Sequence, residues 1–321
     1  MKNDNETATF NLVKETPKAQ KVGHIQSLDM DGFLGRHVGT CSIVKELGRG
    51  SMGIVYVAYQ RSLKRPVAVK ILPKIVVKNL ISAKLFQHEA ETIAILNHPN
   101  IIPVYEVGET EDFYFLTMQL VQGMALSEMM DKTRKHVVPY RRVLPLEETF
   151  RLIIQVLDAL DYAHEEGIVH RDIKPANILV EQRTRRAMIS DFGIAKVSRA
   201  EDINVGMMVG TPHYMAPEQA RGAELDGRAD IYAVGSMLFE MVAGMLPIRN
   251  ERVMDLVRRK ARDPDSVFVQ RPSEINPRIH PELEKIILRA VMANPGERFA
   301  TGREFIEALE NFRNHYMNEQ V

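Results

Sequence analysis

A short stretch of the sequence, HRDIKPANILV at residues 170–180, combines side chains that seldom stand together in a soluble protein. Asp172, Lys174 and Asn177 supply a carboxylate, an ammonium and an amide directly before an apolar, strand-like run. A second carboxylate, Asp191, stands in SDFG after another strand-like run, although alone it is typical of a simple turn. Carboxylate and amide oxygens are hard ligands that suit Mg²⁺, which keeps water and substrate phosphates in its shell. The pattern therefore predicts a magnesium site.

Three glycines form a second candidate feature. GRGSMGIV places Gly48, Gly50 and Gly53 as G-x-G-x-x-G-x-V. A dinucleotide-binding loop of this kind would open a helix, with an acidic residue about 20 positions further on. Here a β-type run, IVYVAY, follows instead. We therefore expect a hairpin that covers phosphates with backbone N–H groups, and a plain glycine-rich turn remains the alternative.

A lysine at the end of VAVK needs a partner. Lys70 alternates with apolar residues on a strand that should be buried on one face, and a buried ammonium must be paired. In the helix expected over roughly 80–97, Leu85, Glu89 and Ile93 are four residues apart and share a face. We therefore expect a Lys70–Glu89 pair. The alternative is a lysine that reaches to solvent and a surface glutamate.

The elements that must position these residues change in character along the chain. Runs such as CSIVKELGRG, PVAVKIL and FYFLTMQL are short and β-rich, whereas LEETFRLIIQVLDALDYAHEEG carries a helical apolar stripe. RADIYAVGSMLFEMVAG is apolar on nearly all faces and should run through a core. Two amphipathic helices are expected from residue 280 onward. The pattern predicts an α+β fold with a small antiparallel β-rich lobe, a hinge near 119–123 and a larger helical lobe.

Composition limits the classes of function. Lys+Arg and Asp+Glu each number 42, so the net charge is zero and neither nucleic acid nor an anionic membrane is expected as a partner. Cys41 is the only cysteine, which fits a reducing compartment. We find no signal-peptide core and no apolar run long enough for a membrane helix. We expect a cytoplasmic protein, with residues 1–37 as a polar, mostly disordered extension.

The motifs together resemble the protein kinase superfamily and, within it, the bacterial eukaryotic-like Ser/Thr kinases. The resemblance covers 38–316 and rests on GRGSMGIV, VAVK, HPNI, HRDIKPAN, DFG, GTPHYMAPE, DIYAVG and ERF in that order. It implies a bilobal protein-kinase fold with a small lobe at 38–120 and a large lobe at 121–316. It also implies ATP and Mg²⁺ as cofactors.

The resemblance assigns a role to each of the polar residues above. Asp172 would accept the proton of the substrate hydroxyl, and Lys174 would contact the γ-phosphate. Asn177 and Asp191 would ligate Mg²⁺. Lys70 would hold the α- and β-phosphates and would itself be held by Glu89. These roles answer what the carboxylate, the ammonium and the amide are for, because phosphoryl transfer depends mainly on positioning and charge neutralisation.

Further residues carry over by the same resemblance. The nucleotide-binding set is Leu47, Gly48, Gly50, Ser51, Gly53, Val55, Ala68, Lys70, Met118, Gln119, Val121 and Leu179, with Met118 as gatekeeper and with Gln119 and Val121 offering backbone hydrogen bonds to adenine. The set that supports substrate binding or the large lobe is Arg171, Thr211, Glu218, Asp230 and Arg298. Within it, Asp230 would brace the catalytic loop and Glu218 would pair with Arg298. His170 is expected as a packed core histidine that, with Ile93 and Phe192, belongs to a hydrophobic spine.

The implied function is a Ser/Thr protein kinase that transfers the γ-phosphoryl group of ATP to proteins, including itself. The alternative is a nucleotide-binding pseudokinase that acts as a scaffold. Implied partners are protein substrates, a Ser/Thr protein phosphatase and a second copy of the chain. Between Ser198 and Thr211 there is no Ser, Thr or Tyr, so the usual activating phosphosite is absent. We hypothesise that Glu201 or Asp202 pairs with Arg171 instead, although both acids can equally be solvated.

Overall fold

The computed structural model describes residues 30–50, 53–74, 94–135, 142–192 and 212–317. The strands are β1 (His37–Val38), β2 (Cys41–Arg49), β3 (Ile54–Gln60), β4 (Arg65–Pro73), β5 (Val104–Glu109), β6 (Phe113–Gln119), β7 (Gly123–Ala125), β8 (Ile178–Glu181) and β9 (Ala187–Ile189). The α-helices are α3 (Leu126–Arg134), α4 (Leu146–Glu165), α6 (Pro217–Arg221), α7 (Arg228–Ala243), α8 (Val253–Arg262), α9 (Pro272–Ile275), α10 (Pro281–Ala290) and α11 (Gly302–Phe312). The shorter helical turns are η1 (Met30–Phe33), η3 (Pro175–Asn177), η4 (Pro212–Tyr214), η5 (Pro264–Ser266), η6 (Pro295–Glu297) and η7 (Arg313–Met317).

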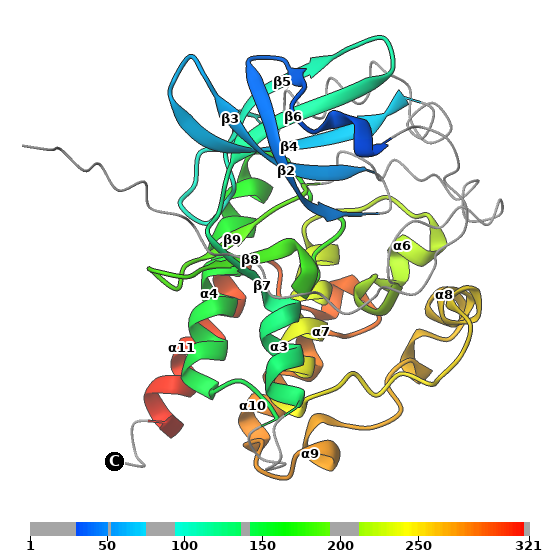
Figure 1. Cartoon of the computed structure of the whole chain (residues 1–321). Coiled ribbons are helices and arrows are strands. Elements are labelled where there is room, and N and C mark those ends of the chain that lie inside the picture. Colours follow the sequence, from blue (N-terminus) through cyan, green and yellow to red (C-terminus); the bar gives the residue numbers. More distant parts are fainter. Residues whose placement is uncertain (1–29, 51–52, 75–93, 136–141, 193–211, 318–321) are drawn as a thin grey trace, which may run out of the picture.

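Two lobes lie one above the other, as Figure 1 shows: a twisted β-sheet at the top and a helical body below it. The upper sheet is antiparallel, with strand order β1-β2-β3-β4-β6-β5. Valines, isoleucines and tyrosines fill these strands, because β-branched and aromatic side chains pack well on a pleated surface. The predicted bilobal α+β fold, with the small β-rich lobe first, is confirmed.

The start of the small lobe differs from the expected boundary. We expected residues 1–37 to be a polar, mostly disordered extension in which a short helix around 24–34 is possible; in the structure, η1 spans Met30–Phe33 and β1 spans His37–Val38. Phe33 lies edge-on to Phe113, with ring centroids 5.1 Å apart, and 6.0 Å from the ring of Tyr56. Val38 is buried. One aromatic residue and one valine in a polar segment are too few to show a periodic pattern, so the sequence alone did not reveal this packing.

Helix α7 is the core of the large lobe. Fourteen of its sixteen residues are buried, as expected for a helix that is apolar on nearly all faces. Helix α4 lies beside it and turns its apolar stripe inward, with Phe150, Ile153, Leu157 and Leu160 buried. Helices α10 and α11, expected as amphipathic, also bury one face each. The large lobe therefore surrounds one central helix whose first turn points toward the other lobe.

A second, small sheet lies between the lobes. Strands β7, β8 and β9 are antiparallel in the order β7-β8-β9. Gly123 permits the close approach of β7 to β8, because a Cβ there would stand 2.0 Å from the carbonyl oxygen of Val180. The amide of Ile102, from the small lobe, donates to the carbonyl of Ile189 at 3.0 Å. This sheet therefore fixes the loop before β8 and the residues after β9 relative to the upper lobe.

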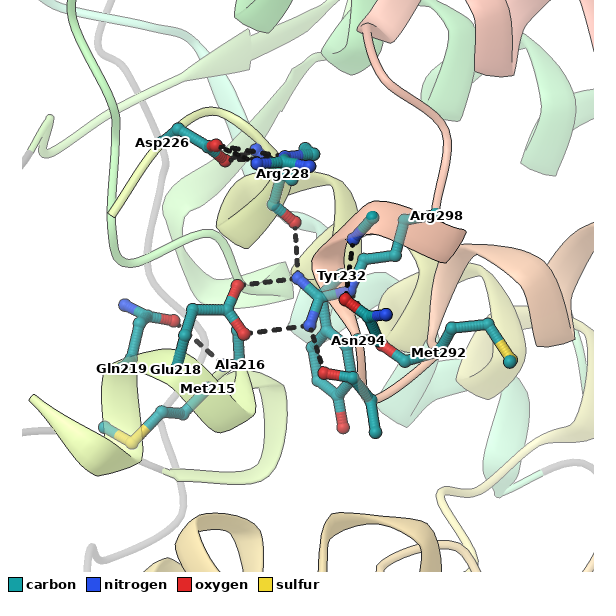
Figure 2. Close-up of polar contacts among 12 residues, drawn as sticks. Met215, Ala216, Glu218, Gln219, Asp226, Arg228, Tyr232, Met292, Asn294 and Arg298 are labelled. Carbon is teal, nitrogen blue, oxygen red and sulfur yellow. Dashed lines mark hydrogen bonds and ion pairs between the residues drawn. The ribbon is translucent and has the colours of Figure 1, made fainter. Parts of the chain in front are cut away.

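A buried ion pair joins two distant parts of the large lobe (Figure 2). The Arg298 guanidinium donates to both oxygens of Glu218, at 2.6 and 2.8 Å. It also donates to the carbonyl oxygens of Arg228, Met292 and Ala293. Arg298 is 2% exposed and Glu218 7%. Every contact of the guanidinium is therefore charge-assisted and shielded from water, which is the setting in which such pairs matter most.

Replacing Arg298 by methionine should destabilise the protein strongly. The change leaves the Glu218 carboxylate buried without a cation, and breaking a buried pair in this way costs about 3–5 kcal/mol. Urea unfolding measures the loss. The matched control is Arg303→Met, because Arg303 is 60% exposed and its contacts with Asp158 and Asp161 are long. We expect the control to change stability by less than about 1 kcal/mol. Equal losses in the two variants would contradict this account.

Candidate active site

The loop from His170 to Asn177 is held from below by one carboxylate. Asp230, in the first turn of α7, accepts the backbone N–H of His170 at 2.8 Å and that of Arg171 at 2.9 Å. Its Oδ2 atom is also 2.8 Å from Nε2 of His164. Arg171 has φ of +66°, a left-handed conformation that costs energy in a residue with a side chain. Asp230 therefore stabilises a turn that the chain would not adopt by local preference.

The turn brings the three polar residues of the loop together. Nζ of Lys174 donates to Oδ2 of Asp172 at 2.8 Å. Nδ2 of Asn177 donates to the backbone carbonyl of Asp172 at 2.8 Å and to its Oδ2 at 3.2 Å. Pro175 begins the η3 turn that separates Lys174 from Asn177. The side-chain nitrogen of Asn177 is thus used in contacts with Asp172, and the side-chain oxygen of Asn177 is the atom that can act as a metal ligand.

Asp191 lies two residues after the end of β9 and faces the small lobe. Its Oδ1 accepts from Nζ of Lys70 at 2.6 Å. Burial acts to raise the pKa of Asp191, but the Lys70 ammonium outweighs it and holds that pKa below its usual value. The expected partner of Lys70, Glu89, lies outside the described residues, so the expected pair remains a prediction. Within the described part of the chain, the partner of Lys70 is Asp191, and the two lobes meet at this charge pair.

His170 and Phe192 form a buried contact beneath the loop. Their ring centroids are 4.5 Å apart, and Nε2 of His170 is 3.0 Å from the carbonyl oxygen of Ser190. His170 is fully buried, and this burial lowers its pKa. The ring is therefore neutral at physiological pH and serves in packing, as the sequence indicated. Ile93, the third residue of the expected spine, lies outside the described residues.

A cleft of about 560 Å³ lies between the lobes and gathers the candidate residues. Of the nucleotide-binding set, all but Ser51, which lies outside the described residues, line it: Leu47, Gly48, Gly50, Gly53, Val55, Ala68, Lys70, Met118, Gln119, Val121 and Leu179. Asp172, Lys174, Asn177 and Asp191 line the same cleft. One cleft therefore brings apolar side chains together with four charged or amide side chains, three from the loop before β8 and one from the segment after β9.

The reason for a glycine differs among the three positions of the hairpin. A Cβ on Gly53 would stand 2.1 Å from the carbonyl oxygen of Ile71, so the approach of β3 to β4 requires this glycine. A Cβ on Gly48 would meet nothing within 4 Å, and one on Gly50 only a backbone oxygen at 3.8 Å. Internal packing therefore does not explain Gly48 and Gly50. Both border the cleft, which fits a backbone that must come close to a bound group.

The hinge near 119–123, which connects the two lobes, restricts how an adenine base could bind. The backbone N–H of Gln119 already donates to the carbonyl oxygen of Pro103 at 3.1 Å. An adenine ring bound here could therefore not use this N–H as a hydrogen-bond donor. Val121 follows two residues later, before β7 begins at Gly123. The spacing fits recognition of a flat base by the main chain at its edge and by Ala68 and Leu179 at its faces.

The donor set fits a magnesium ion bound together with phosphates. Asn177 and Asp191 border the same cleft, from η3 and from the end of β9, and offer an amide oxygen and a carboxylate. Among residues 30–50, 53–74, 94–135, 142–192 and 212–317, no three His, Cys, Asp or Glu side chains gather as metal ligands. Mg²⁺ does not need such a cage, since it is usually held by one or two carboxylates plus substrate phosphates.

Several residues that the sequence analysis singled out lie outside the described residues. Besides Ser51 and Ile93, these are Glu89, Thr211, Ser198, Glu201 and Asp202. The proposed acidic partner of Arg171 therefore stays a hypothesis. Nε of Arg171 is buried and makes no hydrogen bond with the described residues. Gln219 instead contacts the Arg171 backbone, donating from Nε2 to its carbonyl oxygen at 2.9 Å.

The sequence reasoning missed other residues of the cleft wall. Leu116 lies two positions before Met118 on β6, so strand alternation places both on one face and could have found it. Leu72 stands in the same relation to Lys70 on β4. Glu128, in the first turn of α3, adds a carboxylate near the mouth of the cleft. No pattern in the sequence distinguishes it from any other glutamate at the start of a helix.

Comparison with known proteins supports the resemblance to protein kinases that the sequence motifs indicated. The model of the family described as "protein kinase domain" matches residues 41–311. The serine/threonine-protein kinase pkn3 of Myxococcus xanthus is 36% identical over 295 residues, which are 88% of this chain and 52% of that protein. The serine/threonine-protein kinase PrkC of Bacillus subtilis is 33% identical over 276 residues, 85% of this chain and 40% of PrkC. This chain thus spans about half the length of the first relative and less of the second.

Solved structures of kinase domains have the same fold. The kinase domain of PknI from Mycobacterium tuberculosis superposes with a TM-score of 0.68 at 29% identity, over 90% of this chain and 99% of that domain. In the described part of the chain, no helix has both the length and the apolar character needed to cross a membrane.

Asp230→Asn should loosen the turn at His170 and Arg171. An asparagine offers one oxygen where two are needed, and its NH₂ group would face a donor, which costs about 1–3 kcal/mol. Amide hydrogen exchange of His170 and Arg171 is expected to become faster. The control is Asp226→Asn, which makes the same change at an exposed carboxylate just before α7. Unchanged exchange in Asp230→Asn would show that the turn does not depend on this carboxylate.

Proposed function

This chain belongs to the protein kinase family, as its motifs predicted, and we propose that it is an ATP-dependent serine/threonine kinase of proteins. The observation that carries the proposal is the convergence in one cleft of Lys70, Asp172, Lys174, Asn177 and Asp191. These residues come from β4, the loop before β8 and the end of β9, far apart in the sequence. Their grouping supplies a base, two cations and two metal ligands, which are the parts that phosphoryl transfer needs.

Asp172 is the residue proposed to act on the acceptor. Its carboxylate takes the proton of a serine or threonine hydroxyl and orients that oxygen for attack in line with the leaving group. Lys174, already 2.8 Å from Oδ2 of Asp172, is close enough to neutralise charge on the transferred phosphoryl group as well. Asn177 holds the backbone of Asp172 in place through its amide nitrogen. Position and charge therefore act together at one carboxylate.

Lys70 and Asp191 have separate roles in the proposed reaction beside their contact with each other. Lys70 is proposed to hold the α- and β-phosphates, and Asp191 to ligate Mg²⁺. ATP supplies the phosphoryl group and Mg²⁺ neutralises its oxygens when both are bound. The 2.6 Å contact uses Oδ1 of Asp191 and one N–H of Lys70, so the second carboxylate oxygen and the remaining N–H groups are left for these roles. Glu89, the partner that the sequence predicts for Lys70, would then stabilise the ammonium.

The scaffold alternative has no specific observation in its favour. A pseudokinase usually lacks the lysine, the base or the metal ligand, and this sequence has all of them. The relatives that it resembles are themselves called serine/threonine-protein kinases.

Other parts of the proposal rest on the sequence. We propose protein substrates, autophosphorylation, a Ser/Thr protein phosphatase as the opposing enzyme and a homodimer as a functional form. The single cysteine, Cys41, suits a reducing, cytoplasmic setting. Residues 38–316 are proposed as the kinase domain, with 30–37, which carry η1 and the first residue of β1, added to its small lobe.

Asp172→Asn tests the proposed base. The change keeps the shape of the side chain but removes both the proton acceptor and the negative charge. Transfer of labelled phosphate from ATP to a basic protein, with Mg²⁺ present, should fall by about 10²-fold or more. ATP binding should survive. The control is Asp265→Asn, the same change at an exposed carboxylate in η5. Near-normal transfer by Asp172→Asn would reject the assignment, and a wild-type chain that labels neither serine nor threonine would reject the function.

Lys70→Met tests the phosphate-binding cation. Transfer should again fall by at least about 10²-fold, because phosphates held without this ammonium are misplaced. The variant also has a readout that does not depend on activity. Without the Lys70 ammonium, the pKa of Asp191 should rise, since the group that chiefly opposes the effect of burial is then gone. NMR titration of the Asp191 carboxyl measures the shift. Lys285→Met, at an exposed lysine of α10, is the control, and normal transfer by Lys70→Met would contradict the assignment.

A further inference from the structure

A fully buried lysine lies in helix α8 and has no role in the reaction described so far. Lys260 is 0% exposed. Its Nζ donates to the backbone carbonyl oxygens of Met215 at 2.7 Å and His213 at 2.9 Å. The hydroxyl of Tyr232 lies 3.5 Å from Nζ, and the centre of the Tyr232 ring 5.0 Å. The ammonium thus meets two carbonyls of one short segment and the aromatic face of α7.

The environment of Lys260 is unusual for a lysine. Lysines are almost never fully buried unless paired with a carboxylate. Among the described residues no carboxylate forms an ion pair with Lys260, because Glu218, the acid whose charge acts on it, is already bonded to Arg298. The cost of burying this charge is offset only by carbonyl oxygens and an aromatic ring. A lysine retained at such a cost is a candidate for function.

The segment that Lys260 contacts is also held on its other side. The Tyr214 hydroxyl donates to Glu240 of α7. Glu240 in turn lies 2.5 Å from the guanidinium of Arg134, at the end of α3. The side chain of Tyr214 therefore anchors to α7, while the carbonyls immediately before and after it anchor to α8 through Lys260. The path of the backbone through η4 is fixed by these two anchors together.

Hydrogen bonds continue from this segment to the catalytic loop. The backbone N–H of Ala216, next to Met215, donates to Oε1 of Gln219 at 2.9 Å. Nε2 of Gln219 donates to the carbonyl of Arg171, the residue before Asp172. Figure 2 shows Met215, Ala216 and Gln219 close together beside Glu218. A shift of the carbonyl that Lys260 holds would thus be felt one residue from the proposed base.

We propose that Lys260 is a positioning residue for the protein substrate: it holds 212–216 in the shape that receives the acceptor chain beside Asp172. The inference rests on the proposed kinase function, in which GTPHYMAPE is the segment that cradles the peptide. Lys260 does not touch the reacting atoms. It sets the position of the acceptor by fixing two backbone carbonyls, and its own side chain does not line the nucleotide cleft.

The charge state of Lys260 changes close to neutral pH. Burial lowers its pKa to about 7, with the nearby Arg298 guanidinium acting in the same direction and Glu218 acting against it. The other titratable groups that face it are Tyr232 and His213. Burial raises the pKa of Tyr232, which keeps it neutral. Burial and the charge of Lys260 lower the pKa of His213, so that it is neutral above pH 7 as well.

Loss of the proton should weaken the hold on the segment. A neutral amine keeps two N–H groups, but hydrogen bonds from a charged donor are roughly twice as strong as those from a neutral one. Below about pH 7 the ammonium holds both carbonyls, and above it the amine holds them less firmly. The apparent KM for the acceptor should therefore rise as pH increases through this range, whereas the KM for ATP should not follow.

The test compares Lys260→Met with the wild-type chain, using ATP, Mg²⁺ and a basic protein as acceptor. Methionine keeps the length and apolar stem of the side chain and removes its donors. We expect the acceptor KM to rise about fivefold or more, as for the loss of charge-assisted hydrogen bonds, with the KM for ATP changed less than about twofold. Lys285→Met, an exposed lysine on α10, is the matched control and should change neither constant.

Because a buried substitution can unfold the chain, a second measurement needs no apolar variant. The acceptor KM of the wild type is followed from pH 6 to 8.5 beside that of Lys260→Gln, which has an NH₂ donor that does not ionise. The wild-type KM should rise relative to that of Lys260→Gln. Parallel profiles, or a Lys260→Met variant in which both KM values move together, would overturn the proposal. A wild-type chain that phosphorylates no protein would overturn the proposed function itself.

Discussion

The geometry of this site depends on a single buried carboxylate. Asp230 stands at the start of the most buried helix of the large lobe and accepts two successive backbone N–H groups, those of His170 and Arg171. A turn with a left-handed arginine is thereby tied to the part of the protein least able to move. Asp172 follows immediately, so its carboxylate takes its position from the core.

Much of this arrangement could be predicted from the sequence, because it follows from periodicity and from motifs of fixed spacing. Helix α7, which is apolar on nearly all faces, is almost fully buried, and helix α4 buries the apolar stripe that its helical spacing indicates. Strand alternation in VAVK separates Lys70 from Val67 and Val69, and the structure has both valines buried and Lys70 lining the cleft. Gly53 was found for its motif, although the structure gives it a second reason, the approach of β3 to β4. The burial of a residue can be predicted from the sequence where it repeats with the period of the helix or strand that carries it.

The rest could not be read because it depends on contacts between distant segments. Lys260 lies in a basic run, VRRKAR, that resembles a solvated helix end, and only the tertiary structure shows that it is fully buried beneath η4. The contact between Lys70 and Asp191 joins residues 121 apart. The left-handed backbone at Asp191, with φ of +58°, has no signal in residue type. Phe33 packs onto the small lobe from a segment too polar to show a pattern.

The central claim is that one cleft holds the nucleotide and the metal between Lys70, Asn177 and Asp191. The most direct measurement is paramagnetic NMR of the full chain with Mn²⁺ in place of Mg²⁺ and a non-hydrolysable ATP analogue. The account predicts that the signals of the Asn177 side-chain amide and of the Asp191 backbone amide broaden most, and only when nucleotide and metal are both present. Broadening centred on residues outside the cleft, or equally strong without the nucleotide, would contradict it.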